Sequence, residues 1–512
     1  MIKIKFTFLL FILLQANFLL KAGVILDTTF NHTGEVFKPF GNSLTAVSHV
    51  IQTDGRIIAA GNGKLNGISH NVLMRFMKNG IIDSSYGING VVSDTFPNTT
   101  TNQLHGVVLQ NDGKLITAGI ADSVSKRYVV LARYETNGTP DVSFGINGKV
   151  MINMVSASIL AVALQSDGKI VAAGSNAGEF AVYRFNQNGS IDNSFGSGGM
   201  ALTAIGTLPY DAAKAILIQP DGKIVAGGDS YQSLYYLATL VRYNADGSLD
   251  ASFGTGGITV TSVQGYYDEI NHLSLQGNGK IVATGTTTYD AFGTTQNSFM
   301  ALRYDANGIL DAAFGNAGML IASIGTKDDK CFSNVIQQDG KIILAGYTTD
   351  ASVNLNFVML RLNTDGTYDT SFGNGAIVET SIVFGTTNYN DHGQSVALQA
   401  DGKIVLLGHT AFSNSSQFAL VRYTTEFVLG LSDIERPYSS FHVYPNPCHD
   451  QLTIQTNIKS TAKEYLQLFN TNGERIYSQQ IENQQAQIPM AQFAAGEYLI
   501  RYNNQTHKIL KK

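Results

Sequence analysis

The chain has 512 residues, too many for one ordinary hydrophobic core, so either several domains or one large repetitive assembly is expected. Charged residues make up only 14% of it, glycine occupies 52 positions and tryptophan is absent, which is typical of many short strands joined by glycine turns. The net charge is -5 and lysines and arginines are scattered singly, which argues against a nucleic-acid partner.

The first 22 residues have the pattern of a cleavable signal peptide. Two lysines precede an apolar run over residues 6–14, and cleavage after Ala16 or Ala22 fits the sequence. The alternative is an uncleaved membrane anchor. Polar residues from Gln15 onward disfavour it because they break the run well before it could span a bilayer. We therefore expect export to the periplasm and no membrane span after cleavage.

A unit with a period of 54 to 62 residues recurs seven times between residues 23 and 429. Each copy has an Asp-Gly-Lys or Asp-Gly-Arg turn, with asparagine for aspartate in the fifth copy, and a later strand centred on arginine. The turn glycines are Gly55, Gly113, Gly168, Gly222, Gly279, Gly340 and Gly402. The arginines are Arg75, Arg133, Arg184, Arg242, Arg303, Arg361 and Arg422.

The third copy, ILAVALQSDGKIVAAGSNAGEFAVYRFNQNGSIDNSFGSGG, shows the expected local structure of each unit. It reads as strand, tight turn, strand, loop, strand, turn and short strand, with Asp167 and Gly168 as the centre of a type I′ hairpin turn. The second strand is small and apolar in every copy. Such a run suits a strand covered on both faces, with alanine and glycine allowing neighbouring sheets to approach closely.

The ends of the repeat region predict a closed ring. An Asp-x-Ser-Phe-Gly-like tail follows the third strand in six copies, but none follows Arg422. A matching segment, LDTTFN, stands at residues 26–31 instead, so the N-terminus should complete the last unit. This offset favours an all-β, seven-bladed β-propeller closed by the N-terminal strand over an open solenoid, because closure removes exposed sheet edges.

These repeats resemble the delta-60 repeat, which occurs in tandem in bacterial secreted and surface proteins. The resemblance covers residues 24–429 and rests on the period and on the paired motifs LQSDGKIVAAG and YRFNQNGSIDNSFG. It implies a β-propeller and says little about activity.

After a polar linker at 430–440, residues 441–512 contain the segments FHVYPNPCHDQLTIQTN, YLQLFNTNGERIYSQQI and FAAGEYLIRYNNQTHKILKK. They resemble the type A C-terminal sorting domain of the type IX secretion system of Bacteroidetes. The matching positions are Tyr444, Pro445, Asn446, Pro447, Leu452, Ile454, Gly473, Gly496 and Tyr498. Alternating strand patterns predict a small β-sandwich. The resemblance implies the type IX machinery as a partner, passage across the outer membrane, removal of this domain near the linker, and a secreted or cell-surface location.

The only two cysteines, Cys331 and Cys448, fall in different predicted domains, so no disulfide framework is expected. Repeated arginines and aspartates read as structural pairs, with ligand contact as the alternative. No cofactor is expected. Calcium is the one metal that the turns at 244–250 and 363–369 suggest, although both lack the closing glutamate of a calcium loop.

Four histidines precede the repeated glutamine at unequal distances, which disfavours a shared metal site. They are His49, His105, His272 and His392.

Tyrosines gather in the variable loops and suit an unknown protein or glycan ligand. They are Tyr210, Tyr231, Tyr235, Tyr236, Tyr266, Tyr267, Tyr289 and Tyr389.

No linear catalytic motif is present, so the sequence predicts a non-catalytic binding or structural scaffold and not an enzyme. The alternatives are a propeller hydrolase or lyase and a glycan-binding adhesin. Two carboxylates or a histidine cluster within about 6 Å at one channel mouth, with shifted pKa values, would favour the enzyme.

Overall fold

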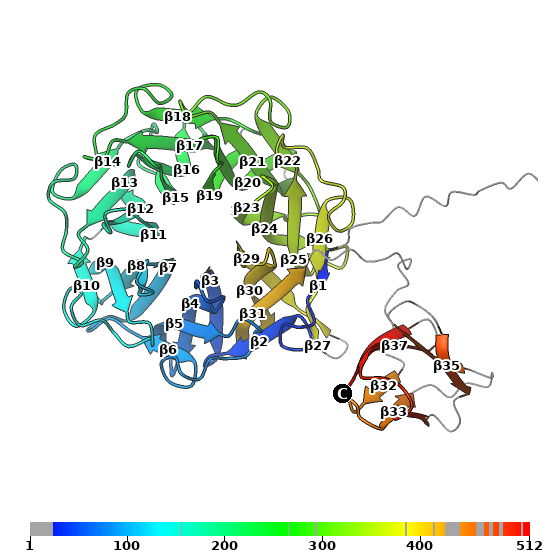
Figure 1. Ribbon diagram of the computed structural model, residues 1–512. Helices are drawn as coiled ribbons and strands as arrows, with labels where there is room; N and C mark the ends of the chain where they lie inside the picture. Colours follow the sequence, from blue (N-terminus) through cyan, green and yellow to red (C-terminus); the bar gives the residue numbers. More distant parts are fainter. Residues whose placement is uncertain are drawn as a thin grey trace, which may run out of the picture. The chain divides into compact units, whose positions relative to one another are not determined.

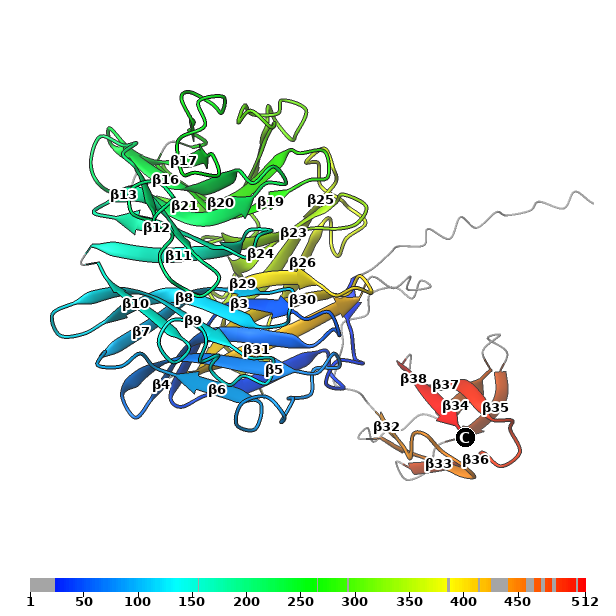
Figure 2. The ribbon, with the colours of Figure 1, turned by 60° about the vertical axis from the view of Figure 1, so that its left-hand side comes forward.

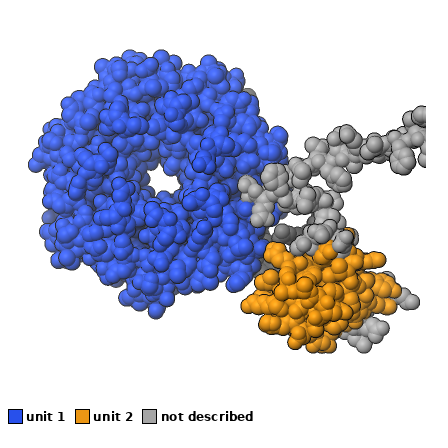
Figure 3. Space-filling view, viewed as in Figure 1, with its two compact units in different colours: residues 1–429 blue, residues 430–512 orange. Residues whose placement is uncertain are grey.

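The computed structural model describes residues 24–154, 156–264, 266–291, 294–384, 387–412, 415–424, 441–456, 465–470, 475–480, 485–502 and 505–512. The chain divides into two compact units, residues 1–429 and 430–512. In the first unit, antiparallel sheets stand as blades around a central channel (Figures 1 and 3). Figure 2, turned by 60°, shows the same blades from the side. The predicted all-β, seven-bladed propeller is confirmed.

Blades 1 to 6 each contain four strands in order from the channel outward. Blade 1 has β3 (Ser43–Ile51), β4 (Ile57–Leu65), β5 (Ile68–Phe76) and β6 (Val91–Asp94). Blade 2 has β7 (Thr101–Leu109), β8 (Leu115–Asp122), β9 (Arg127–Tyr134) and β10 (Lys149–Asn153). Blade 3 has β11 (Ala157–Leu164), β12 (Ile170–Asn176), β13 (Glu179–Phe185) and β14 (Met200–Thr203). Blade 4 has β15 (Ala212–Ile218), β16 (Ile224–Gln232), β17 (Tyr235–Tyr243) and β18 (Ile258–Thr261).

The remaining blades follow the same plan. Blade 5 has β19 (Tyr267–Leu275), β20 (Ile281–Ala291), β21 (Thr294–Tyr304) and β22 (Met319–Ala322). Blade 6 has β23 (Lys330–Ile336), β24 (Ile342–Thr349), β25 (Leu355–Leu362) and β26 (Ile377–Thr380), followed by the short hairpin β27 (Val383–Phe384) and β28 (Thr387–Asn388). Blade 7 has β29 (Asn390–Leu398), β30 (Ile404–Phe412) and β31 (Ser415–Thr424).

The N-terminal segment completes blade 7, as predicted. Strand β1 (Ile25–Leu26) pairs with the end of β31, and β2 (Glu35–Pro39) runs antiparallel to the same strand, with Glu35 opposite Val421. The first described residues and the last strand of the repeat region therefore share one sheet. The blue and ochre strands lie side by side in Figure 1.

The blades are held together by seven hydrophobic clusters, one between each pair of neighbours. Strand β12 shows why its sequence is continuously apolar. Ile170 and Ala172 pack toward blade 2, whereas Val171 and Ala173 pack toward blade 4. Alternate residues of one strand thus cover opposite faces, and each sheet needs both neighbours to bury its apolar surface.

The first hairpin of each unit differs from the predicted type I′ turn. In the third copy Gly168 has a φ of 82°, but Asp167 does not have a positive φ. The backbone NH of Gly168 donates to the carbonyl of Gln165, and the NH of Gln165 donates to the carbonyl of Lys169. This is a three-residue loop that ends with glycine in the left-handed region. The Asp167 carboxylate instead accepts a hydrogen bond from the NH of Lys169, at 3.0 Å.

The C-terminal unit consists of two sheets around one core, which agrees with the predicted sandwich. One sheet has β32 (Phe441–Tyr444), β33 (Gln451–Thr456) and β36 (Gln485–Pro489). The other has β35 (Arg475–Gln480), β34 (Tyr465–Phe469), β37 (Gly496–Tyr502) and β38 (Gln505–Lys511).

Three sequence-based assignments lie outside the described residues: the signal peptide at 1–22, the linker at 430–440 and the turn at Gly473. Within the segments that the structure describes, no helix is long and apolar enough to cross a membrane.

Candidate functional site: the channel mouth

Every inner strand contains a β-bulge at the same point, and the bulged residue lines the channel. In β15 the register shifts between Ala213 and Ala215, which leaves Lys214 without a cross-strand partner in β16. A bulge re-aims a side chain, and here it directs one residue per blade at a central cavity of about 530 Å³. We call these residues the bulge tier: Val47, His105, Leu160, Lys214, Asn271, Phe332 and Gln394.

The glycine of each second strand makes room for the bulge. A Cβ on Gly228 would lie 1.9 Å from the carbonyl oxygen of Ala212, and one on Gly285 would lie 1.9 Å from that of Glu269. In all seven blades a Cβ on the equivalent glycine would lie 1.8 to 2.1 Å from a carbonyl oxygen of the inner strand. The sequence explained this glycine by the close packing of neighbouring sheets. That explanation was incomplete, because the atom nearest to an added Cβ is a carbonyl oxygen of the inner strand in the same sheet.

A second set of equivalent positions lies two residues before each bulge, toward the end of the channel where the inner strands begin. We call it the mouth tier: Thr45, Gln103, Ser158, Ala212, Glu269, Lys330 and His392. No residue type occurs twice within either tier, whereas the opposing glycine is the same in all seven blades. Invariant positions build the blades, and the variable ones are where ligand-specific chemistry is expected.

The charged members of the two tiers concentrate on blades 4 to 6, where Lys214 joins two carboxylates. Its Nζ lies 2.6 Å from Oδ1 of Asp229 and 2.6 Å from Oε2 of Glu269. Burial raises the pKa of Asp229 despite the charge of Lys214. Burial also acts to raise the pKa of Glu269, but the Lys214 ammonium outweighs it and the pKa is lowered. The site thus holds two neighbouring carboxyl groups with pKa values shifted in opposite directions.

A chain of tyrosine rings leads from the surface to this ion cluster. Ring centroids are 5.8 Å apart for Tyr210 and Tyr231, 5.1 Å for Tyr231 and Tyr236, and 4.9 Å for Tyr236 and Tyr267. Tyr210 is 57% exposed, and Nζ of Lys214 lies 5.5 Å from the centroid of Tyr267. We call these four residues the tyrosine track.

The other tyrosines singled out in the sequence are distributed differently. Tyr235 and Tyr266 form a neighbouring pair with centroids 6.2 Å apart. Tyr289 is half-exposed on β20, and Tyr389 directly precedes β29. The structure therefore brings six of the eight predicted tyrosines together on blades 4 and 5.

Blade 7 adds an imidazole pair to the mouth. The rings of His392 and His409 are stacked with centroids 4.8 Å apart, and Tyr347 of blade 6 packs edge-on against His392 at 5.0 Å. Burial, assisted by His392, lowers the pKa of His409 to about 3. Burial and the charge of Lys330 lower the pKa of His392. The stacked imidazoles are accordingly neutral near pH 7.

The remaining histidines occupy separate places. His105 and His272 line the cavity, and burial lowers the pKa of His272 to about 4. His49 is buried between blades 1 and 7, where its Nδ1 lies 3.0 Å from Oγ of Ser395. Among the described residues no group of three or more histidine, cysteine or acidic side chains is arranged to hold a metal ion.

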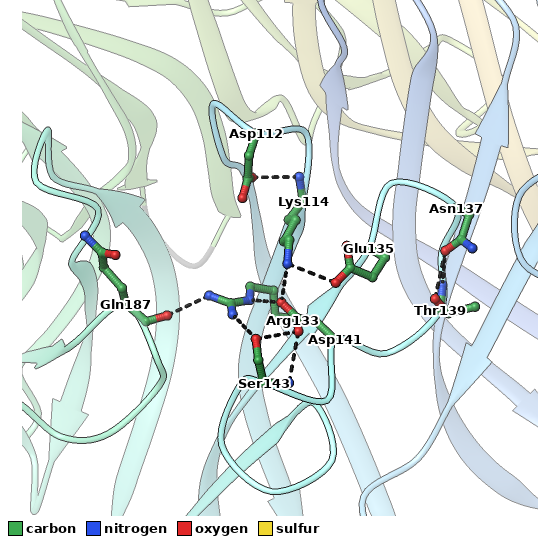
Figure 4. A network of polar contacts seen from close by, with 9 residues as sticks. All are labelled: Asp112, Lys114, Arg133, Glu135, Asn137, Thr139, Asp141, Ser143 and Gln187. Carbon is green, nitrogen blue, oxygen red and sulfur yellow. Dashed lines mark hydrogen bonds and ion pairs between the residues drawn. The ribbon is translucent and has the colours of Figure 1, made fainter.

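The repeated arginines lie away from the cavity, in a polar contact that we call the clasp. In blade 2, Nε of Arg133 donates to Oδ2 of Asp141 at 2.7 Å, and Nη1 donates to the carbonyl of Gln187 in blade 3 at 2.6 Å (Figure 4). Lys114, from the Asp-Gly-Lys turn, binds the same Asp141 oxygen, and the guanidinium covers the ring of Phe144. In blade 2 the recurring lysine, arginine and aspartate thus join hairpin, tail and next blade.

The turns that suggested calcium use their oxygen atoms for hydrogen bonds within the protein. Oδ1 of Asp246 accepts from the NH and the hydroxyl of Ser248. Oδ1 of Asp365 accepts from the same two groups of Thr367.

The residues that match the sorting domain form part of its core and its edge. Leu452 and Ile454 are fully buried, and the hydroxyl of Tyr498 donates to the carbonyl of Ala494 at 2.7 Å. The side chain of Asn446 donates to the carbonyl of Lys508 and accepts from the NH of Leu510. It thereby attaches the Pro-Asn-Pro segment, Pro445 to Pro447, to β38. The strand that pairs with β38, β37, begins at Gly496 and ends at Tyr502.

Together these features define an exported seven-bladed propeller with a separate secretion module. Seven segments match the family described as "Domain of unknown function (DUF5122) beta-propeller", at residues 52–86, 110–144, 165–195, 219–253, 276–314, 337–372 and 399–426. Residues 442–512 match the family described as "Secretion system C-terminal sorting domain". The chain is a DUF5122 propeller protein with a type IX sorting domain, which confirms both resemblances and a secreted or cell-surface location. It matches no curated relative.

Solved structures resemble the fold at low sequence identity. The polysaccharide lyase Uly1 has 9% identity and a TM-score of 0.42 over 76% of this chain and 91% of its own. A PL25 ulvan lyase has 8% identity and a TM-score of 0.38 over 74% and 96%. Trypanosoma rangeli sialidase in complex with sialic acid has 10% identity and a TM-score of 0.36 over 75% and 56%. At these values the likeness concerns the fold alone.

The prediction that the chain is not an enzyme does not hold. It rested on the absence of linear catalytic motifs, whereas solved structures that resemble this fold include two polysaccharide lyases and a sialidase. In a propeller, groups from several blades converge across the channel, so a motif within one stretch of sequence is not required.

Proposed function

We propose that the exported propeller binds a carbohydrate chain at the channel mouth, along the tyrosine track. The observation that supports this most directly is the continuity of the track from exposed Tyr210 to Tyr267, whose hydroxyl lies 3.2 Å from Nζ of Lys214. Tyrosine combines an apolar ring face for the C–H surface of a sugar with a hydroxyl for its polar edge. The ion cluster at the inner end offers charged partners for sugar hydroxyl groups.

The mixed lining of the channel also supports a ligand with apolar and polar faces. Blade 3 contributes only the apolar Leu160, Ala161 and Val162 to the cavity, whereas Lys214, Glu269, Asn271 and Gln394 come from blades 4, 5 and 7. Apolar and polar side chains around one cavity suit an amphipathic ligand such as a sugar ring.

A glycan array and calorimetry on the exported protein test this proposal. We expect binding to at least one glycan class, and at least a tenfold loss for Tyr236→Ala, which corresponds to about 1.4 kcal/mol. Tyr368→Ala is the matched control, because Tyr368 is 41% exposed on blade 6 and lies outside the track. Failure to bind any glycan, or equal effects of the two substitutions, contradicts the proposal.

Catalysis on the bound chain is the second candidate, favoured by the carboxyl groups of Asp229 and Glu269. Oδ1 of Asp229 and Oε2 of Glu269 each lie 2.6 Å from Nζ of Lys214, so the distance between these two oxygens is at most twice 2.6 Å. Two nearby carboxyl groups with pKa values shifted apart fit general acid and nucleophile or base roles in glycoside cleavage.

New reducing ends released from a bound glycan would support the catalytic candidate. In that case Glu269→Gln should abolish release while binding is retained, since the amide keeps the size and one acceptor of the carboxylate. Release at an unchanged rate by both Glu269→Gln and Asp229→Asn contradicts these roles.

A further inference from the structure

Lys330 occupies a particular place in the mouth tier. It is the first residue of β23, two positions before the bulged Phe332, and its equivalents on the flanking blades are Glu269 and His392. Its side chain is half-buried. Its cross-strand partner Tyr347 packs against Phe332, and cross-strand partners project from the same face of a sheet, so the Lys330 side chain lies on the Phe332 side of the blade.

The backbone of Lys330 pairs with Tyr347, but no hydrogen bond or ion pair joins its side chain to another residue in the described part of the chain. Its nearest acidic neighbour in the tier, Glu269, is already bound by Lys214 and by Nδ2 of Asn271, at 2.6 and 3.2 Å. The charge of Lys330 nevertheless acts on both flanking blades, since it contributes to lowering the pKa of Glu269 and of His392. A half-buried cation without a direct ion-pair partner is costly, which indicates a position kept for an external anion.

The surroundings of Lys330 indicate what kind of molecule carries that anion. Its cross-strand partner is Tyr347, whose ring lies 5.8 Å from Phe332 and 5.0 Å from His392, centroid to centroid. These rings provide apolar faces next to the cation. The neutral imidazole of His392 supplies a donor or acceptor for hydroxyl groups.

We propose that Lys330 binds the acidic group of a carbohydrate, so that the mouth selects acidic over neutral glycans. This inference rests on the proposed function, because it places one sugar of the bound chain in the Lys330 position. Carboxylate and sulfate share the chemistry that an ammonium recognises, namely a negative charge with several acceptor oxygens. The two sources are distinguished experimentally.

Calorimetry on the exported protein with matched polymer pairs tests the inference. Polygalacturonate is compared with its methyl-esterified form, and dextran sulfate with dextran. We expect the acidic member of at least one pair to bind about tenfold more tightly than its neutral partner. The pair that shows the preference identifies the acidic group.

Variants of Lys330 show whether this lysine causes the preference. Lys330→Met should reduce the ratio to about twofold or less while neutral binding is retained, and Lys330→Arg should keep most of it. Lys327→Met is the matched control, since Lys327 is an exposed lysine three residues earlier. If Lys330→Met does not fold, Lys330→Gln replaces it. In addition, the ratio of acidic to neutral affinity of the unmodified protein must shrink in about 1 M salt, where the Debye length is about 3 Å.

The outcomes separate this inference from the proposed function. Equal affinity of the native protein for acidic and neutral polymers, or an unchanged ratio in the Lys330 variants, overturns the acidic preference while glycan binding stands. Absence of binding to every polymer overturns both.

Discussion

Asp27 and Arg422 are almost four hundred residues apart in the chain, yet Nη2 of Arg422 lies 2.8 Å from Oδ2 of Asp27. The same guanidinium donates to the carbonyl of Lys78 in blade 1 and covers the ring of Phe30. In the other blades the aspartate follows its arginine by eight positions, as in Arg133 and Asp141. In blade 7 the aspartate comes from the N-terminus, so this clasp is also the closure of the ring.

Loss of the closing clasp should destabilise the whole ring. Both side chains are nearly inaccessible, and removal of one partner leaves a buried charge without compensation. We expect Asp27→Ala to lower the free energy of unfolding by about 3 kcal/mol in denaturant titrations. Asp54→Ala is the control, because Asp54 is half-exposed and its ion pair with Arg56 should contribute less than about 1 kcal/mol. Equal effects of the two substitutions would falsify the closing role of Asp27.

The sequence predicted this closure because a missing tail and an extra matching segment can be counted without coordinates. It also placed the tyrosines in the variable loops and four histidines shortly before the repeated glutamine of the inner strands. It did not predict Lys214, Glu269 or Lys330 as site residues. A bulge shifts the register by one residue, so the strand pattern alone does not tell which side chain faces the channel. The glycine that recurs within each second strand was the available signal, because its lack of a side chain accommodates the bulged strand.

Alanine at the bulge glycine should therefore disturb the site as well as stability. A Cβ on Gly228 meets the carbonyl oxygen of Ala212 at 1.9 Å, and a backbone atom cannot move aside cheaply. We expect Gly228→Ala to cost about 2 kcal/mol or more and to weaken ligand binding through displacement of Lys214. Gly222→Ala is the matched control: its φ is 85° and its Cβ meets nothing within 4 Å, so about 1 kcal/mol of backbone strain is expected without loss of binding. Retained affinity in Gly228→Ala argues against the bulge as the device that positions Lys214.

The hairpin loop gives a second backbone prediction. Gly168 has a φ of 82°, and a Cβ there would lie 2.9 Å from Nε2 of Gln187. A β-branched residue resists this conformation, so Gly168→Val should lower stability by about 1 kcal/mol or more. Asp167→Ala, which removes only the exposed hydrogen bond to the NH of Lys169, should change it by about 0.5 kcal/mol or less. Unchanged thermal unfolding of Gly168→Val contradicts the loop geometry described here.

Buried histidines should make the ring sensitive to mild acid. Burial lowers the pKa of His49 and His272 to about 4, whereas an unfolded histidine titrates near 6.5. Between these values the unfolded state binds more protons, so stability falls as the pH decreases from about 6.5 to about 4. Each site contributes a slope of about 1.4 kcal/mol per pH unit. His272→Asn should remove one such contribution to the pH dependence of the free energy of unfolding, measured by denaturant titrations at a series of pH values. The same change at exposed His32 is the control.

Truncation of the C-terminal unit should stop export at the periplasm without unfolding the ring. The sorting domain has its own core around Leu452 and Ile454, and the seven clusters between blades contain no residue after Tyr423. Deletion of residues 441–512 should therefore leave a folded propeller, verified by its unfolding transition, that accumulates in the periplasmic fraction. Asn446→Ala should give a milder defect, because it removes only the two hydrogen bonds that join the Pro-Asn-Pro segment to β38. Appearance of the truncated ring outside the cell at the native level would show that the signal for outer-membrane passage lies elsewhere in the chain.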